Sequence, residues 1–202
     1  VNAATFSRFT HQGQICMSAN RILVQKSIYN EFLDKYVAKV SSLKVGDPKN
    51  PETIIGPVIN DRQAANLEAM IEKGIAEGAK AVIKGNIKGK MVEPTILVDV
   101  TTDMSVAQEE LFGPVVCVIP FETEEEAIQI ANDTRFGLSG AIHTANLERG
   151  VEMAKKVHTG MIHVNDLTIN DEPNAYLTMK ITIDTVEQGK FTYNDAYYWL
   201  PK

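Results

Sequence analysis

Short apolar, β-rich runs alternate along this chain with segments whose apolar residues recur at the spacing of an α-helix. Short apolar runs predict strands, and a period near 3.6 residues predicts helices. The predicted strands cover residues 21–24, 81–83, 95–98, 115–121, 140–143 and 161–164, and the predicted helices cover about 27–43, 61–78, 123–133 and 147–157. Strands that alternate with helices are joined by crossovers and form a mainly parallel sheet. We therefore predict an α/β fold with a mainly parallel sheet and helices on both faces.

Local signals mark several boundaries of these elements. Ser27 is the predicted N-cap of the first helix, and Gly46-Asp47-Pro48 closes that segment. The third helix opens with Thr123-Glu-Glu-Glu126, which has the spacing of a capping box. Residues 85–90 predict a turn before the next apolar run.

The segment 176–202 departs from the α/β alternation. Met179, Ile181 and Ile183 alternate with polar residues, and a second β-prone run rich in aromatic residues follows the turn-like residues 187–189. This pattern predicts a two-stranded ribbon that is amphipathic on its own pleat. Because an isolated ribbon is marginally stable in water, we expect it to dock against the domain or against another subunit.

Charge and hydropathy argue against two classes of partner. The chain has a net charge of −6 and a pI near 5.3, and its Lys and Arg residues form no cluster. We therefore expect no binding of nucleic acid and no anionic-membrane surface. The longest apolar stretch, residues 115–121, is far shorter than the roughly 20 residues that cross a membrane as a helix. Residues 1–10 also lack the apolar core of a signal peptide.

The cysteines and histidines predict no metal site. Cys16 and Cys117 are far apart in the sequence, which excludes a disulfide framework and predicts a protein of the reducing cytoplasm. The histidines show no metal-ligand spacing. His163 alternates with apolar residues and is interpreted as lying on one face of a strand. Cys117 lies within an apolar run and is interpreted as a small buried hydrophobic residue.

Cys16 has more polar neighbours than Cys117. It lies in the sequence GQICMSAN, residues 13–20, which leads directly into a predicted strand. Backbone amides of a loop that enters a strand can face a ligand. A reactive cysteine attacks as the thiolate, so it needs a lowered pKa or a base that removes its proton. The residues alone leave two interpretations of Cys16 open, a nucleophile and an unreactive thiol.

A second candidate site precedes the strand at 115–121. Glu109 and Glu110 are followed by the turn-forming sequence Phe112-Gly113-Pro114. One interpretation is a pair of acidic residues at the solvated end of a loop. The other is a fixed carboxylate that, together with an aromatic ring, holds a polar planar ligand.

Two ordered motifs resemble those of the aldehyde dehydrogenase superfamily. The segment FTHQGQICMSANRILV is similar to the family's active-site segment, which centres on Gly-Gln-x-Cys, and EELFGPVV is similar to its Glu-x-Phe-Gly-Pro signature. The segments KVGDP, IGPVI, EPTIL, AIQIANDTRFGLSGAI and TGMIHVND also follow the family pattern, so the resemblance covers residues 1–175. The sequences GQICMSANR and VNDLTINDEPNA are most similar to those of members that act on aromatic aldehydes such as benzaldehyde or vanillin.

The resemblance implies a role for several residues. Cys16 would add to the aldehyde carbonyl and form a thiohemiacetal, hydride transfer to NAD or NADP would give a thioester, and water would release the acid. The backbone N–H of Cys16 would supply half of the oxyanion hole. Glu110 would accept hydrogen bonds from the nicotinamide ribose, and Phe112 would pack near the nicotinamide ring. Asn20 and Arg21 match the end of the motif, where packing and orientation are the expected roles.

This chain also departs from the family pattern. Full members carry a Rossmann-type cofactor domain, an oxyanion Asn and a general-base Glu before the cysteine, and only 15 residues precede Cys16 here. We therefore expect this fragment to bind no cofactor by itself and to be inactive as a dehydrogenase. After NDEPNA the family continues with a Phe-Gly-Gly loop, whereas this chain continues with a tail that resembles the family's oligomerisation ribbon.

These features predict two parts, a catalytic domain at 1–175 and a grafted ribbon at 176–202 that forms a homo-oligomer. The alternative is an engineered or excised assembly module whose ribbon pairs with a partner's edge strand. A third interpretation is thiol-dependent esterase activity, which needs an activated Cys16 but no cofactor.

Overall fold

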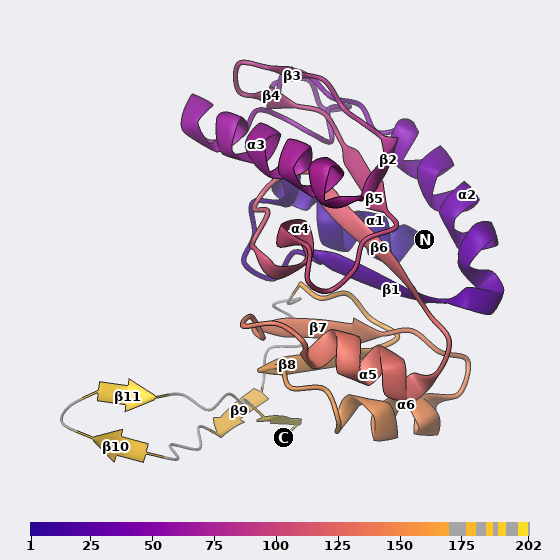
Figure 1. Cartoon of the computed structure of the whole chain (residues 1–202). Coiled ribbons are helices and arrows are strands. Elements are labelled where there is room, and N and C mark those ends of the chain that lie inside the picture. The colour runs from indigo at the N-terminus through magenta and orange to yellow at the C-terminus, as the bar shows by residue number, and fades with distance from the viewer. Residues whose placement is uncertain (170–176, 181–184, 188–189, 193–197, 202) are drawn as a thin grey trace.

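The computed structural model of the protein describes residues 1–169, 177–180, 185–187, 190–192 and 198–201. Its central feature is a four-stranded sheet in the order β1-β6-β5-β2 (Figure 1). These strands span, in that order, Arg21–Gln25, Val115–Phe121, Thr95–Val98 and Lys80–Ile83. β6 pairs in parallel with both β1 and β5, whereas the edge strand β2 is antiparallel to β5. The prediction of a mainly parallel sheet is therefore confirmed.

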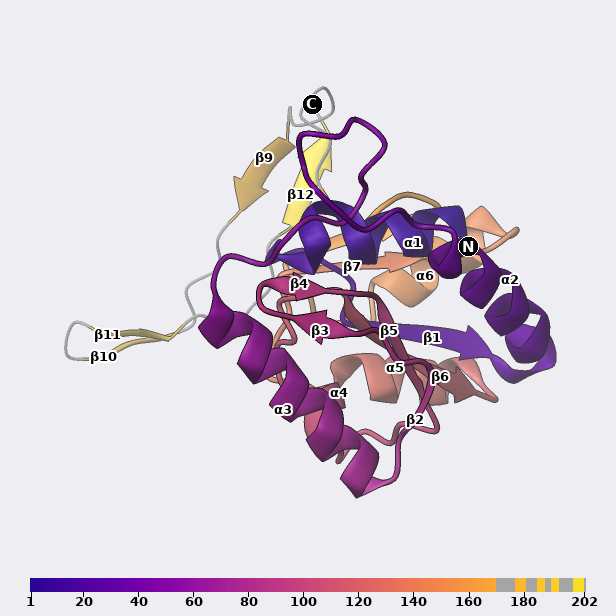
Figure 2. The ribbon, with the colours of Figure 1, turned by 90° about the horizontal axis from the view of Figure 1, so that it is seen from above.

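Helices cover both faces of this sheet, as predicted (Figure 2). α1 (Asn2–Phe9) and α2 (Tyr29–Ser41) contribute to the buried cluster on one face. α3 (Asp61–Glu77) and α4 (Ser105–Gln108) contribute to the buried cluster on the other face. The sheet therefore forms the middle layer between two pairs of helices.

The two central strands, β5 and β6, send apolar side chains into both clusters. In β5, Ile96 belongs to the cluster with α1 and α2, and Leu97 belongs to the cluster with α3 and α4. In β6, Val116 belongs to the cluster with α1 and α2, and Cys117 belongs to the cluster with α3 and α4. Because both faces of these strands are buried, their sequences are continuously apolar instead of alternating. Cys117 is 0% exposed, which confirms its interpretation as a buried hydrophobic residue.

A smaller pair of strands lies beyond β1 (Figure 1). β7 (Ser139–Ile142) and β8 (Met161–Val164) form a separate two-stranded parallel sheet, with α5 (Glu124–Asn132) and α6 (Leu147–Ala154) beside it. The sequence predicts each of these four elements but not their separation from the four-stranded sheet. Periodicity identifies an element, whereas strand pairing depends on contacts between distant residues.

Local boundaries differ from the predictions in several places. The N-cap at Ser27 is wrong, because Lys26–Ile28 form a 3-10 turn between β1 and α2, and Ile28 occupies the N-cap without a side-chain bond. Thr123 Oγ1 accepts a hydrogen bond from Glu126 N at 3.2 Å, as a capping box requires. The Glu126 carboxylate instead accepts from the N–H of Glu122, one residue before the expected donor. Sequence patterns also miss α1 and the single-turn α4.

Residues 85–90, predicted as a turn, contain a short strand, β3 (Ile87–Lys88), and the turn at 89–90 that joins it to the next strand. β3 and β4 (Met91–Val92) pair antiparallel. They lie close to α3 in Figures 1 and 2.

The C-terminal segment contains four short strands in two antiparallel pairs, β9 with β12 and β10 with β11. They span Leu177–Lys180, Tyr198–Pro201, Thr185–Glu187 and Lys190–Thr192, respectively. The residues that join these strands lie outside the described residues, so the single two-stranded ribbon at 176–202 stays a prediction. In the part of the chain that the structure describes, no helix is long and apolar enough to cross a membrane.

Candidate active site

Cys16 lies at the tip of a tight turn between α1 and β1. The turn is closed by a hydrogen bond from Ser18 N to Ile15 O at 2.9 Å, which places Cys16 at its first central position. The thiol is exposed. The backbone N–H of Cys16 makes no hydrogen bond with any described residue, so it is free to donate to an incoming oxygen atom. The exposed thiol and the free N–H leave room for a carbonyl group at Cys16, and both interpretations of this residue stay predictions.

The backbone before this turn has an unusual conformation. His11, Gln12 and Gly13 have successive φ values of 50°, 58° and 71°, in the left-handed region. A Cβ atom on Gly13 would lie 2.3 Å from the carbonyl oxygen of Gly113, so only glycine fits there. The cysteine motif and the Phe-Gly-Pro motif are therefore in direct backbone contact.

In the second loop, the two neighbouring carboxylates of Glu109 and Glu110 differ in their contacts. The Glu109 carboxylate forms an ion pair with Arg135, whose guanidinium carbon lies 5.0 Å from the centroid of the Phe136 ring. Glu110 is exposed, and its carboxylate makes no hydrogen bond or ion pair with residues 1–169. Phe112 is half-buried, with a φ of 24°. Glu110 is thus the carboxylate of the pair that is open to a ligand.

The buried side chain of Arg8 connects the two loops. The Arg8 guanidinium donates to the carbonyl of Ala19 at 3.4 Å and to the carbonyl of Gly113. Its side chain is buried, with a residue exposure of 2%, and its Nε has no hydrogen-bond partner among the described residues. Burial lowers the pKa of Arg8 to about 10, although electrostatic interactions with nearby groups, including the Glu110 carboxylate, partly counteract this effect. The guanidinium therefore stays charged at neutral pH.

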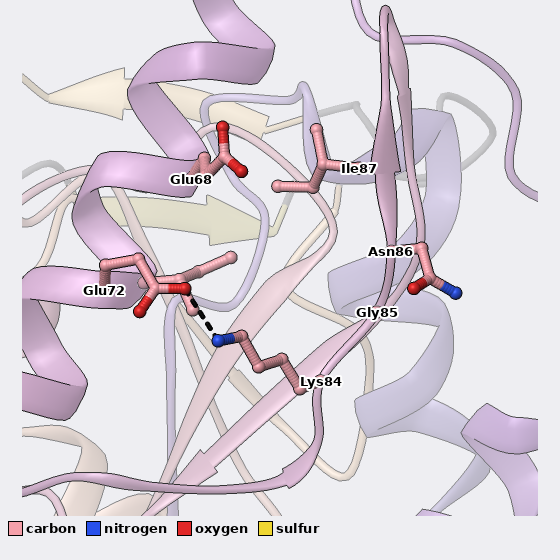
Figure 3. A pocket seen from close by; sticks show the side chains of 7 residues that line it. Glu68, Glu72, Lys84, Gly85, Asn86 and Ile87 are labelled. Carbon is pink, nitrogen blue, oxygen red and sulfur yellow. Dashed lines mark hydrogen bonds and ion pairs between the residues drawn. The ribbon is translucent and has the colours of Figure 1, made fainter.

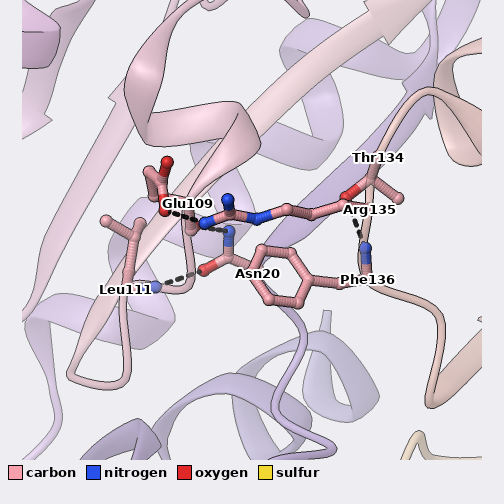
Figure 4. Close-up of polar contacts among 6 residues, drawn as sticks. All are labelled: Asn20, Glu109, Leu111, Thr134, Arg135 and Phe136. Carbon is pink, nitrogen blue, oxygen red and sulfur yellow. Dashed lines mark hydrogen bonds and ion pairs between the residues drawn. The ribbon is translucent and has the colours of Figure 1, made fainter. Parts of the chain in front are cut away.

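Asn20 and Arg21 connect the cysteine loop to its surroundings. The Asn20 side chain contacts the backbone of Glu109 and of Leu111 (Figure 4). The Arg21 guanidinium donates to carbonyl groups at the C-terminal end of α5, including Ile130 at 2.9 Å and Ala131 at 3.1 Å. Both side chains therefore hold backbone groups of neighbouring segments, and their orienting role stays a prediction.

Glutamine side chains fix the outer edges of both loops. Gln14 Oε1 accepts from the N–H of Ile59 at 2.9 Å, and Gln63 on α3 donates to the carbonyl of Phe112 at 3.0 Å. The sequence patterns do not identify Arg8, Gln63 or Arg135 as part of the site. Each is an ordinary polar residue of a helix or loop in the sequence, and only the fold brings it to the motifs.

The remaining candidates lie apart from this chemistry. Burial raises the pKa of the Cys117 thiol to about 12, so this cysteine stays a neutral core residue. His163 lies in β8, as predicted, and is half-buried. Among the described residues, no group of three or more His, Cys, Asp or Glu side chains could hold a metal ion.

A shallow hollow lies between α3 and the β3 strand (Figure 3). Its lining includes Glu68, Glu72, Lys84 and Asn86, and Lys84 is paired with Glu72 at 2.6 Å. No residue of the Cys16 or Glu110 loop lines this hollow. It is therefore not part of the candidate active site.

The residues of the second loop fit part of a nicotinamide cofactor. An exposed carboxylate without a protein partner, such as that of Glu110, can accept hydrogen bonds from the hydroxyl groups of a ribose. A half-buried aromatic ring, such as that of Phe112, offers an apolar surface to a planar ring. The free N–H and exposed thiol of Cys16 are the groups needed for attack on a carbonyl and for stabilising the resulting oxyanion.

Comparison with known proteins identifies the family of this chain. The model of the aldehyde dehydrogenase family matches residues 1–193. The benzaldehyde dehydrogenase YfmT of Bacillus subtilis is 66% identical over 175 residues, which cover 87% of this chain and 36% of that protein. A vanillin dehydrogenase of Corynebacterium glutamicum is 44% identical over 173 residues, covering 86% of this chain and 36% of that protein.

Solved structures show the same relationship. An NAD-dependent benzaldehyde dehydrogenase from Corynebacterium glutamicum has a TM-score of 0.79 and 42% identity, over 83% of this chain and 36% of that one. A betaine aldehyde dehydrogenase from Staphylococcus aureus, in complex with NAD+, has a TM-score of 0.80 and 35% identity, over 84% of this chain and 35% of that one. The chain belongs to the aldehyde dehydrogenase family. It spans about a third of the length of the relatives that it matches.

Proposed function

We propose that this chain provides the cysteine nucleophile and part of the nicotinamide site of an NAD- or NADP-dependent aldehyde dehydrogenase. The single observation that carries the proposal is the contact between the two loops, which holds the exposed thiol of Cys16 and the free carboxylate of Glu110 on adjoining segments. The substrate that we propose is an aromatic aldehyde, because two of the most similar relatives are named for benzaldehyde and vanillin.

The chemistry of Cys16 follows from its position in the turn. Its thiolate would attack the carbonyl carbon of the aldehyde, and the free N–H of Cys16 would donate to the oxygen atom that becomes negative. The bound cofactor supplies the hydride acceptor when present. Loss of hydride from the thiohemiacetal leaves a thioester on Cys16, and attack by water releases the carboxylic acid and restores the thiol.

Glu110 and Phe112 would bind the nicotinamide end of the cofactor. The Glu110 carboxylate would accept hydrogen bonds from the ribose hydroxyl groups, and Phe112 would pack beside the nicotinamide ring. No described side chain hydrogen-bonds the Cys16 thiol, and none of the residues assigned a role in this site is a general base for hydrolysis of the thioester. We therefore expect the isolated chain to form an acyl-enzyme more readily than it completes aldehyde oxidation.

Acylation of Cys16 tests this function in the 202-residue chain without added cofactor. The protein is mixed with p-nitrophenyl acetate, and the acetyl group is located by mass spectrometry. We expect acetylation at Cys16, faster than acetylation of N-acetylcysteine at the same pH, and lost in Cys16→Ala. The matched control is Cys117→Ala, which should be acetylated at the rate of the unchanged chain because Cys117 is buried. A rate at Cys16 no greater than that of the free thiol would contradict the proposal.

Two further proposals concern the setting of the protein. We propose that residues 176–202 form the oligomerisation ribbon of a homo-oligomer, which the alternation of apolar and polar residues there supports. We also propose a reducing compartment such as the cytoplasm, because a nucleophilic Cys16 must remain a free thiol. The assembly-module function is the alternative if Cys16 proves unreactive.

A further inference from the structure

The side-chain amide of Asn20 contacts the backbone on both sides of Glu110. Its Nδ2 donates to the carbonyl oxygen of Glu109 at 3.0 Å, and its Oδ1 accepts from the N–H of Leu111 at 3.4 Å. Figure 4 shows the amide between these two backbone groups. The two contacts therefore fix the peptide groups that flank the residue proposed to hold the ribose.

Asn20 is itself anchored to the sheet. Its backbone carbonyl accepts from the N–H of Cys117 at 3.1 Å, immediately before β1 pairs with β6. The same short loop carries Cys16 at its tip. Asn20 thus connects the rigid start of the β1–β6 pair to the backbone around Glu110.

An ion pair distinguishes the carboxylate of Glu109 from that of Glu110. Glu109 belongs to an ion pair with Arg135, and Arg135 in turn lies over the ring of Phe136 (Figure 4). This pair engages the carboxylate of Glu109, while Glu110 has no such partner among residues 1–169. Asn20 therefore holds the backbone on both sides of Glu110, and the Glu110 carboxylate remains available to a ligand.

We infer that Asn20 is a positioning residue that aims the Glu110 carboxylate at the nicotinamide ribose, in a fixed relation to Cys16. This inference rests on the proposed function. Two hydroxyl groups of a ribose can bond one carboxylate together only when that carboxylate has a defined orientation. Without the Asn20 contacts, the loop would lose that orientation, and binding of the ribose would cost additional conformational entropy.

Two substitutions separate the two hydrogen bonds of Asn20. Asn20→Ala removes both of them. Asn20→Asp keeps an acceptor for the N–H of Leu111 but replaces the donor to Glu109 with an oxygen atom. The matched control is Asn30→Ala, because Asn30 is exposed on α2 and makes no side-chain hydrogen bond among the described residues.

The first measurement is amide hydrogen exchange by NMR. In Asn20→Ala we expect faster exchange at Leu111 and its neighbours, with no change at Val118 in β6. In Asn20→Asp the N–H of Leu111 should keep its protection. A uniform rise in exchange across β5 and β6 would show a merely structural role for Asn20 and would overturn the inference.

The second measurement uses nicotinamide mononucleotide as the probe, with the carboxylate signal of Glu110 followed by NMR during the titration. The fragment is expected to hold no complete cofactor by itself, so the nicotinamide half is titrated at high concentration. We expect a shift in the unchanged chain, and a Kd about fivefold weaker in Asn20→Ala, as for the loss of one or two neutral hydrogen bonds. Asn30→Ala should bind as the unchanged chain does. Unchanged affinity in Asn20→Ala would overturn the inference while leaving the proposed function intact. No response of Glu110 in the unchanged chain would overturn both.

Discussion

Arg8 shows how a single buried charge can organise a site without a carboxylate partner. Among the described residues no ion pair includes Arg8, and its hydrogen bonds go to the carbonyl groups of Ala19 and Gly113. Carbonyl dipoles offset part of the cost of burying the charge, and the lowered pKa of Arg8 shows that the offset is incomplete. The charge is retained where it joins the two loops of the candidate site.

Gly13 is the residue at which the contact between the loops is most sensitive. We expect Gly13→Ala to lower the free energy of unfolding by more than about 2 kcal/mol, where about 1–2 kcal/mol is the cost of the positive φ alone and the remainder comes from the clash with the Gly113 carbonyl. Urea denaturation measures the loss. The control is Gly46→Ala, because a Cβ there would only touch Thr53 Oγ1 at an ordinary 3.5 Å. Equal, small losses in both variants would show that the loops separate at little cost.

Arg21 ties two elements together that the sequence places far apart. From the first residue of β1, its guanidinium donates to the carbonyl groups of Ile130, Ala131 and Asp133, at the C-terminal end of α5. The last carbonyl groups of a helix have no partners within it, and a cation is favoured beside them. Burial lowers the pKa of Arg21, so its charge is partly desolvated as well as bonded. Arg21 therefore connects the start of β1 to the C-terminal end of α5.

Replacing Arg21 tests this connection. We expect Arg21→Met to destabilise the fold by about 2 kcal/mol, as for a hydrogen-bonded charged group, with faster amide exchange at the end of α5. Arg62→Met is the matched control, because Arg62 is exposed on α3 and makes no ion pair or side-chain hydrogen bond among the described residues. An unchanged exchange rate at the end of α5 would contradict the proposed connection.

The sequence predicts elements better than it predicts their contacts. All six predicted strands and all four predicted helices are present near the expected positions, because each contains a local apolar run or apolar residues at helical spacing. α4 is a single turn, and β3 and β4 are two residues each, so none of them shows a period. Cys16 and Glu110 are recognisable because they belong to motifs. Arg8 and Arg135 cannot be recognised in this way, since their partners Gly113 and Glu109 lie 105 and 26 residues away in the sequence.

Among residues 1–169, two buried clusters form the core on the two faces of the four-stranded sheet. The fully buried residues of both clusters lie between Phe9 and Ile119. We propose that folding depends on these two clusters and that assembly depends on residues 176–202. Assembly and folding should therefore respond differently to removal of that segment.

Deleting residues 176–202 tests the proposed division at the scale of the whole molecule. We expect the free energy of unfolding of the remaining chain to change by less than about 1 kcal/mol, because the two clusters stay intact. Light scattering should show a smaller particle, since the proposed ribbon supplies the pairing surface between subunits. A chain in which residues 176–202 are shuffled is the matched control, because it keeps length and charge but loses the alternation, and it should behave as the deletion does. An oligomeric state that is the same in all three chains would contradict an assembly role, and a large loss of stability would show that the segment belongs to the domain instead.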